Sequence, residues 1–176
     1  MEHWSLKKFN WRCTIPCLIF DPASAVLPTT NPAALVKTNG TNHTFNELDF
    51  DTTTDESCYW IFQMDEFYDS GAIQIHVFWK AAATTGSVVW QANLLGRVDT
   101  EIWDTALGSA SYIQDTVQGT TEYLSKATID IASTGLNPSD LVILKISRDA
   151  DGTGGTDNMA GDARLLNVIL EFTVRN

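Results

Sequence analysis

The chain is poor in the residues that most often carry enzyme chemistry. Its 176 residues include three histidines and three cysteines, and they contain neither a G-x-S-x-G nucleophile elbow nor a P-loop. These motifs place reactive groups at fixed spacings, so their absence argues against the enzyme classes built on them. His76 stands alone on a predicted strand, which indicates a structural residue and not a catalyst. We expect a non-enzymatic protein without a cofactor.

Basic residues are scarce as well. Eleven lysines and arginines stand against 22 aspartates and glutamates, and the net charge is −11. An acidic surface repels nucleic-acid phosphate and anionic lipid, so we expect neither nucleic acid nor membrane as a partner. The first twelve residues differ, because Lys7, Lys8 and Arg12 outnumber Glu2 there. This basic segment predicts either docking on an acidic surface or a solvated terminus.

Long apolar runs are also missing. No stretch reaches the ~18 apolar residues of a membrane span. The apolar run 13–20 follows basic residues and precedes Ala23-Ser24-Ala25, as in a signal peptide, but it is short and Asp21 follows it closely. We therefore favour a docked N-terminal arm over a signal peptide.

The three cysteines, Cys13, Cys17 and Cys58, cannot all pair within one chain. A zinc site would need Cys13 and Cys17 to recruit two further ligands brought close by the fold. Free buried thiols are the simpler expectation.

What the chain does contain is a series of β-branched and aromatic runs separated by Gly, Asp, Asn and Ser turns. The runs predict strands at 34–38, 44–50, 57–64, 72–80, 87–97, 109–117, 123–131, 141–148 and 165–174. Residues 73–79 alternate, with Ile73, Ile75, Val77 and Trp79 on one face. One helical turn is predicted near 104–108. The pattern predicts an all-β antiparallel sandwich, most simply a jelly roll, with an extended N-terminal arm.

Two regions are expected: an arm at residues 1–30 and a β-sandwich domain at residues 31–176. Pro16, Pro22 and Pro28 keep helices out of the arm. The arm is rich in large apolar side chains that need a surface to cover them. We expect it to dock through Trp4, Phe9, Trp11, Ile15, Leu18 and Phe20.

The longest polar stretch, residues 148–164, carries Asp149, Asp151, Asp157 and Asp162. Carboxylates are ligands that Ca²⁺ accepts, but the spacing lacks the terminal glutamate of an EF-hand. The alternative is a hydrated loop whose aspartates pair with Arg148 and Arg164.

Four tryptophans have two interpretations. Trp60, Trp79, Trp90 and Trp103 could form a platform on which sugar rings stack. The first three occupy the middle of predicted strands, where large residues usually fill the space between two sheets. Core packing is therefore the competing interpretation.

Packing and turn motifs occur in the run 21–35, the Tyr59-Trp60 strand with Tyr68 after it, Trp79-Lys80-Ala81-Ala82-Ala83, Ser147-Arg148-Asp149-Ala150-Asp151 and the run 160–166. Over most of residues 21–172, these motifs resemble those of β-sandwich proteins in the virions of tailed bacteriophages. The resemblance implies a non-enzymatic protein, often trimeric, that binds the capsid shell and ties its capsomers together.

The leading hypothesis is thus a capsid cement or decoration protein. It would form a homotrimer, bind the major capsid protein or another virion protein, be made in the host cytoplasm and reside on the capsid surface. The alternative is a receptor- or glycan-binding head module of a phage tail fibre.

Overall fold

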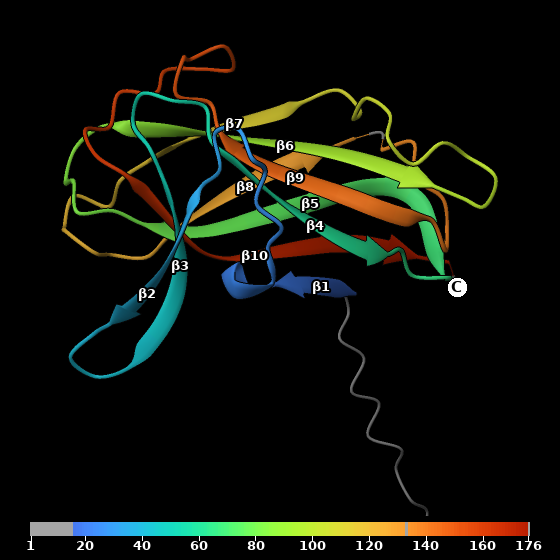
Figure 1. Ribbon diagram of the computed structural model, residues 1–176, viewed down its shortest axis with the longest axis horizontal. Coiled ribbons are helices and arrows are strands. Elements are labelled where there is room, and N and C mark those ends of the chain that lie inside the picture. The colour runs from blue at the N-terminus through green and yellow to red at the C-terminus, as the bar shows by residue number, and fades with distance from the viewer. Residues whose placement is uncertain (1–15, 133, 176) are drawn as a thin grey trace, which may run out of the picture.

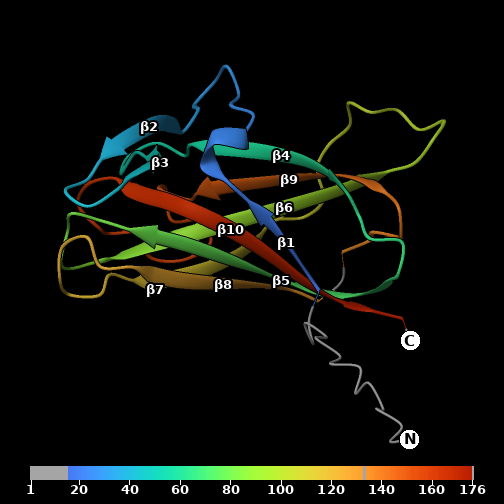
Figure 2. The same ribbon diagram turned by 90° about the horizontal axis from the view of Figure 1, so that it is seen from below.

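Two antiparallel β-sheets pack face to face and form a sandwich (Figures 1 and 2). The computed structural model describes residues 16–132 and 134–175. The six-stranded sheet contains β1 (Cys17–Phe20), β2 (Ala34–Asn39), β3 (Thr44–Phe50), β5 (Tyr68–Lys80), β8 (Ser125–Ile131) and β10 (Ala163–Val174). The four-stranded sheet contains β4 (Ser57–Gln63), β6 (Ser87–Arg97), β7 (Ser111–Thr116) and β9 (Leu141–Arg148). The predicted all-β jelly-roll sandwich is confirmed.

The strand order shows how distant segments meet. The six-stranded sheet runs β2-β3-β10-β5-β8, and β1 pairs with β10 beyond the point where β3 pairs with it. The four-stranded sheet runs β4-β9-β6-β7. In both views the β2–β3 hairpin lies at the end of the sandwich opposite the C-terminus (Figures 1 and 2).

Strand positions follow the alternating sequence pattern closely. The strands predicted at 44–50, 87–97 and 141–148 have the observed bounds, and the other predicted strands differ by a few residues at their ends. Residues 73, 75, 77 and 79 of β5 are all fully buried, as the alternation predicts. The apolar face of each strand therefore identified the core.

One local feature differs from prediction, and another adds detail to the predicted arm. The helical turn predicted at 104–108 is wrong: this segment folds back along β6, where the N–H of Gly108 donates to the carbonyl of Leu94. Within the predicted arm, Cys17–Phe20 forms β1, and Val26 forms an isolated bridge with Tyr59 of β4. Backbone pairing thus attaches these residues to both sheets.

The core lies between the sheets and is built around aromatic contacts. The rings of Trp79 on β5 and Trp90 on β6 meet edge to face at 6.1 Å, and Phe50 on β3 meets Trp90 at 5.2 Å. The indole N–H of Trp79 donates to Asp115 at 2.8 Å. Large rings with one satisfied polar atom are well suited to link two sheets.

Strand β9 is apolar on both faces. Val142, Leu144 and Ile146 point into the core, whereas Leu141 and Ile143 lie on the outward face. Within residues 16–132 and 134–175 no further sheet covers this outward face, so it leaves apolar surface available on the sandwich exterior.

Helical structure is nearly absent. In residues 16–132 and 134–175 the one helical segment is a 3₁₀ turn at Pro22–Ser24, capped by Asp21. No helix in this described part of the chain is long and apolar enough to cross a membrane.

Shortening a core residue of β9 tests the packing. Leu144→Ala should lower the free energy of unfolding by about 2–5 kcal/mol, because it removes buried methyl groups and leaves a cavity. Leu141→Ala, on the same strand but 43% exposed, should change it by about 0.5 kcal/mol. Urea denaturation measures both, and equal losses would contradict the assigned faces of β9.

Candidate functional site

The structure separates the four tryptophans of the predicted platform. Trp60, Trp79 and Trp90 are 3%, 0% and 0% exposed, so they belong to the core and cannot stack on a ligand. Trp103 is 40% exposed and lies in the loop between β6 and β7. It is the one member of the set that a ligand can reach.

Trp103 lines a groove on the outward face of the four-stranded sheet. The groove has a volume of about 530 Å³. Its lining combines side chains of β4 and β9 with the loop 98–110 and the segment after β1: Val26, Tyr59, Ile61, Trp103, Asp104, Thr105, Leu107 and Ile143. Ile61 and Ile143 are register partners on neighbouring strands, so they form a continuous apolar floor. We call this the Trp103 groove.

The loop that carries Trp103 is tied to the sheet beneath it. The side-chain amide of Asn93 on β6 donates to the carbonyl of Gly108 at 2.9 Å, and the Gly108 N–H donates to Leu94. A Cβ at position 108 would lie 2.7 Å from the Leu94 carbonyl oxygen, so glycine is needed for this close approach. These contacts hold the loop against the outward face.

The Trp103 groove offers both kinds of contact that a sugar uses. Trp103 and Tyr59 present aromatic surface to the apolar face of a ring. Asp104 and Thr105 supply an acceptor and a hydroxyl for hydrogen bonds at the edge. An apolar groove with a few polar groups is the usual form of a small-ligand site.

A buried ion pair organises the Asp-rich loop. The guanidinium of Arg148 makes two parallel bonds to Asp157, at 3.0 and 2.8 Å, and both side chains are almost completely buried. Arg148 also donates to the carbonyls of Phe50, Met159 and Gly161. Asp157 is therefore committed to Arg148, as the alternative interpretation of this loop expected in part. The other half of that interpretation is wrong, because Arg164 contacts Asp49 and Glu122 outside the loop.

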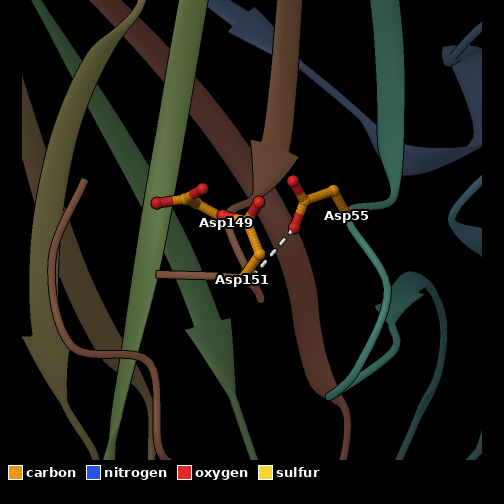
Figure 3. A group of neighbouring side chains, drawn as sticks. All are labelled: Asp55, Asp149 and Asp151. Atoms are coloured by element: carbon orange, nitrogen blue, oxygen red, sulfur yellow. Dashed lines mark hydrogen bonds between the residues drawn. The ribbon is translucent and has the colours of Figure 1, made fainter. Parts of the chain in front are cut away.

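Of the other three aspartates predicted as calcium ligands, two join a carboxylate from a distant part of the chain and one does not. Asp149 and Asp151 lie next to Asp55, and the three carboxylates offer oxygens within 4.8 Å of one another (Figure 3). The backbone N–H of Asp151 donates to Asp55 at 3.2 Å. Asp162 is outside this acidic cluster. Asp55 is too far away in sequence for spacing to identify it as a member.

Burial, neighbouring carboxylates and hydrogen bonds shift the pKa values of the aspartates in the acidic cluster. Burial, together with the neighbouring Asp151 and Asp55, raises the pKa of Asp149, and the N–H of Gly154 opposes the shift. Hydrogen bonds from Thr153 lower the pKa of Asp151. The cluster presents hard oxygen atoms of the type that Ca²⁺ takes.

The predicted arm residues and cysteines fall into two groups. Trp4, Phe9, Trp11, Ile15 and Cys13 lie outside the described residues. Leu18 and Phe20 belong to β1, where Phe20 packs its ring 5.8 Å from Trp60 and 5.1 Å from Phe62. Cys58 is a free buried thiol as expected, whereas Cys17 is free but exposed.

No family profile and no curated protein matches the chain. Its fold is similar to a solved CBM35 from Cellvibrio japonicus Abf62, with a TM-score of 0.56 and 13% identity over 91% of this chain and 96% of that chain. It is also similar to a family 35 carbohydrate binding module from Clostridium thermocellum, with a TM-score of 0.53 and 11% identity over 87% and 97% of the two chains.

Larger proteins contain the same fold as one part. The chain matches Arthrobacter globiformis T6 isomalto-dextranase complexed with panose with a TM-score of 0.51 and 13% identity, over 88% of this chain and 23% of that chain. The two modules matched along nearly their whole length are carbohydrate-binding modules, and the enzyme is matched in part. These similarities establish a shared β-sandwich fold.

Removing Arg148 tests the buried ion pair. Arg148→Met should lower the free energy of unfolding by about 3–5 kcal/mol, because Asp157 is left buried without its partner. Arg97→Met, which affects a more exposed arginine, should cost about 0.5 kcal/mol. Urea denaturation compares the two, and losses of equal size would show that the ion pair does not stabilise the loop.

Removing one charge from the acidic cluster tests the repulsion within it. Asp55→Asn keeps the acceptor for the Asp151 N–H and should raise the urea midpoint slightly at pH 7. Ionised Asp149 costs stability above its raised pKa, so the gain should fade as the pH falls through that pKa. It should also shrink in 1 M NaCl, where the Debye length is about 3 Å.

Asp99→Asn, in an exposed loop, is the control for Asp55→Asn and should leave the midpoint unchanged. If Asp55→Asn lowers the midpoint in the absence of divalent ions, repulsion is not the dominant interaction. If the loss appears only when calcium is added, the acidic cluster is a cation site.

Proposed function

We propose that this protein is a non-catalytic glycan-binding module whose ligand lies in the Trp103 groove. The observation that carries the proposal is the exposed indole of Trp103 beside Tyr59, above the apolar floor of Ile61 and Ile143. The flat aromatic surface suits the apolar face of a sugar ring, and the neighbouring polar groups suit its hydroxyls.

The fold supports the same proposal. The carbohydrate-binding modules named above share the β-sandwich along nearly their whole length. Fold alone does not determine function, so the Trp103 groove is the primary support for glycan binding and the shared fold is the secondary support. The type of sugar is left to experiment.

The capsid cement hypothesis, with its homotrimer, capsid partner and virion location, rests on the sequence resemblance alone. The glycan-binding alternative has the groove as additional support. A glycan-binding head module of a phage tail fibre is consistent with both the sequence resemblance and the Trp103 groove. We therefore keep it as the proposal for the case in which the protein is viral.

Truncating Trp103 tests the proposal. Isothermal titration calorimetry against soluble oligosaccharides of glucose, xylose, galactose and arabinose should detect binding by the unmodified chain. Trp103→Ala should weaken that binding about tenfold or more, which is ~1.4 kcal/mol, because it removes the stacking surface. The unfolding midpoint should be unchanged, since the side chain is outside the core.

Phe67→Ala is a matched control, because Phe67 is another exposed aromatic residue but does not line the Trp103 groove. It should leave affinity unchanged. Equal losses for the two variants, or no binding to any oligosaccharide, would contradict the proposal.

A further inference from the structure

A second groove lies on the other, six-stranded sheet. It has a volume of about 660 Å³ and adjoins the β2–β3 hairpin. Its lining includes Phe45, Asn46, Lys80, Glu122 and Leu166. In both views this hairpin and the loop 98–110 project at opposite ends of the molecule (Figures 1 and 2). We call it the Lys80 groove.

The Lys80 groove is built around a buried charge. Lys80 at the end of β5 and Glu47 on β3 are 6% and 2% exposed, and their charged atoms lie 2.9 Å apart. The ammonium also donates to Glu122 at 2.6 Å and lies 4.9 Å from the centroid of the Phe45 ring. Two carboxylates and an aromatic face thus fix the position of a cation in the groove.

The electrostatics favour a permanently charged Lys80. Burial alone would lower its pKa, but the hydrogen bonds to Glu122 and Glu47 outweigh that effect and raise the pKa above its usual value. The ammonium is therefore a fixed donor and not a proton-transfer group. The ammonium has three N–H donors, and it contacts carboxylate oxygens of two residues, Glu47 and Glu122.

The buried Lys80 is not the only polar group of the groove. The lining also carries exposed polar side chains on Asp21, His43, Thr44 and Glu122. Glu122 accepts hydrogen bonds from Lys80 at 2.6 Å and from Arg164 at 2.9 Å. These exposed donors and acceptors around the Phe45 ring are groups with which a ligand can form hydrogen bonds.

We propose that the Lys80 groove is a second binding site for a polyhydroxylated ligand, the end or side of a glycan chain. This inference rests on the proposed glycan-binding function and adds a second site to it. A hydroxyl group both donates and accepts, so adjacent hydroxyls on a sugar match a carboxylate beside an ammonium. Phe45 supplies the apolar contact for the ring.

The Lys80 groove is arranged for binding and not for hydrolysis. One ammonium contacts oxygens of both Glu47 and Glu122, at 2.9 and 2.6 Å. A glycosidase needs the scissile bond between its two carboxyl groups. Here both carboxylates are engaged by the same ammonium and Glu47 is buried, so the pair is not placed to act on a bond between them.

Two sites on different sheets have a functional consequence. The Trp103 groove lies on the four-stranded sheet and the Lys80 groove on the six-stranded sheet, and Val26 and Asp21, five positions apart in the chain, line one groove each. The module would therefore hold two glycan chains, or two parts of one chain. Linking two sites increases the apparent affinity for a polymer without any new contact.

The experiment is an NMR titration of the isotope-labelled full chain with cellohexaose, xylohexaose, laminarihexaose and β-1,3-galactotriose. We expect at least one of them to shift the backbone amides of residues 43–46, Lys80 and Glu122. Glu122→Gln and Phe45→Ala should each weaken binding at these amides about tenfold. Both variants should leave any shifts at Tyr59 and Trp103 unchanged.

Trp103→Ala is the reciprocal variant and should leave the shifts at the Lys80 groove intact. Glu122 is exposed and glutamine keeps an acceptor oxygen for Lys80, so Glu122→Gln should lower the unfolding midpoint only slightly and remain informative if Phe45→Ala fails to fold. Shifts confined to the Trp103 groove would overturn the second site and leave the proposed function standing. Shifts confined to the Lys80 groove would support the second site and contradict the Trp103 groove. No shift at either groove would overturn both.

Discussion

The edge-to-face contact of Trp79 and Trp90 is the constraint on which the rest of the molecule depends. It joins β5 of the six-stranded sheet to β6 of the four-stranded sheet, so the two sheets meet through the inward faces of these strands. Because the inward positions are filled by large apolar residues, ligand binding is left to the outward faces and the loops. Both grooves lie on outward faces, one on each sheet.

The Arg148–Asp157 ion pair stabilises the loop that follows β9. The guanidinium donates to carbonyls of β3 and of this loop, so one side chain supplies hydrogen bonds to several backbone carbonyls. The same loop brings Asp149 and Asp151 against Asp55. One aspartate of the loop is thus neutralised by a cation, and two are held near a third carboxylate.

The two grooves would contact a ligand through different interactions. The Trp103 groove has an apolar floor and an exposed indole, so its affinity would come mainly from stacking and burial. The Lys80 groove has a fixed ammonium between carboxylates, so its affinity would come mainly from charge-assisted hydrogen bonds. A module with both could bind two chemically different parts of a glycan, and salt would weaken only the second contact strongly.

The sequence by itself determined the strands, the fold class and the lack of a catalytic motif, because alternation and turn residues act over a few positions. The sequence also identified four tryptophans as candidates for a sugar-stacking platform, but it did not show which of them is exposed. Only the tertiary structure decided that Trp103 is exposed, that Asp157 binds Arg148, and that Asp55 joins Asp149. Such choices arise from contacts between residues far apart in the chain, and local spacing carries no information about those contacts.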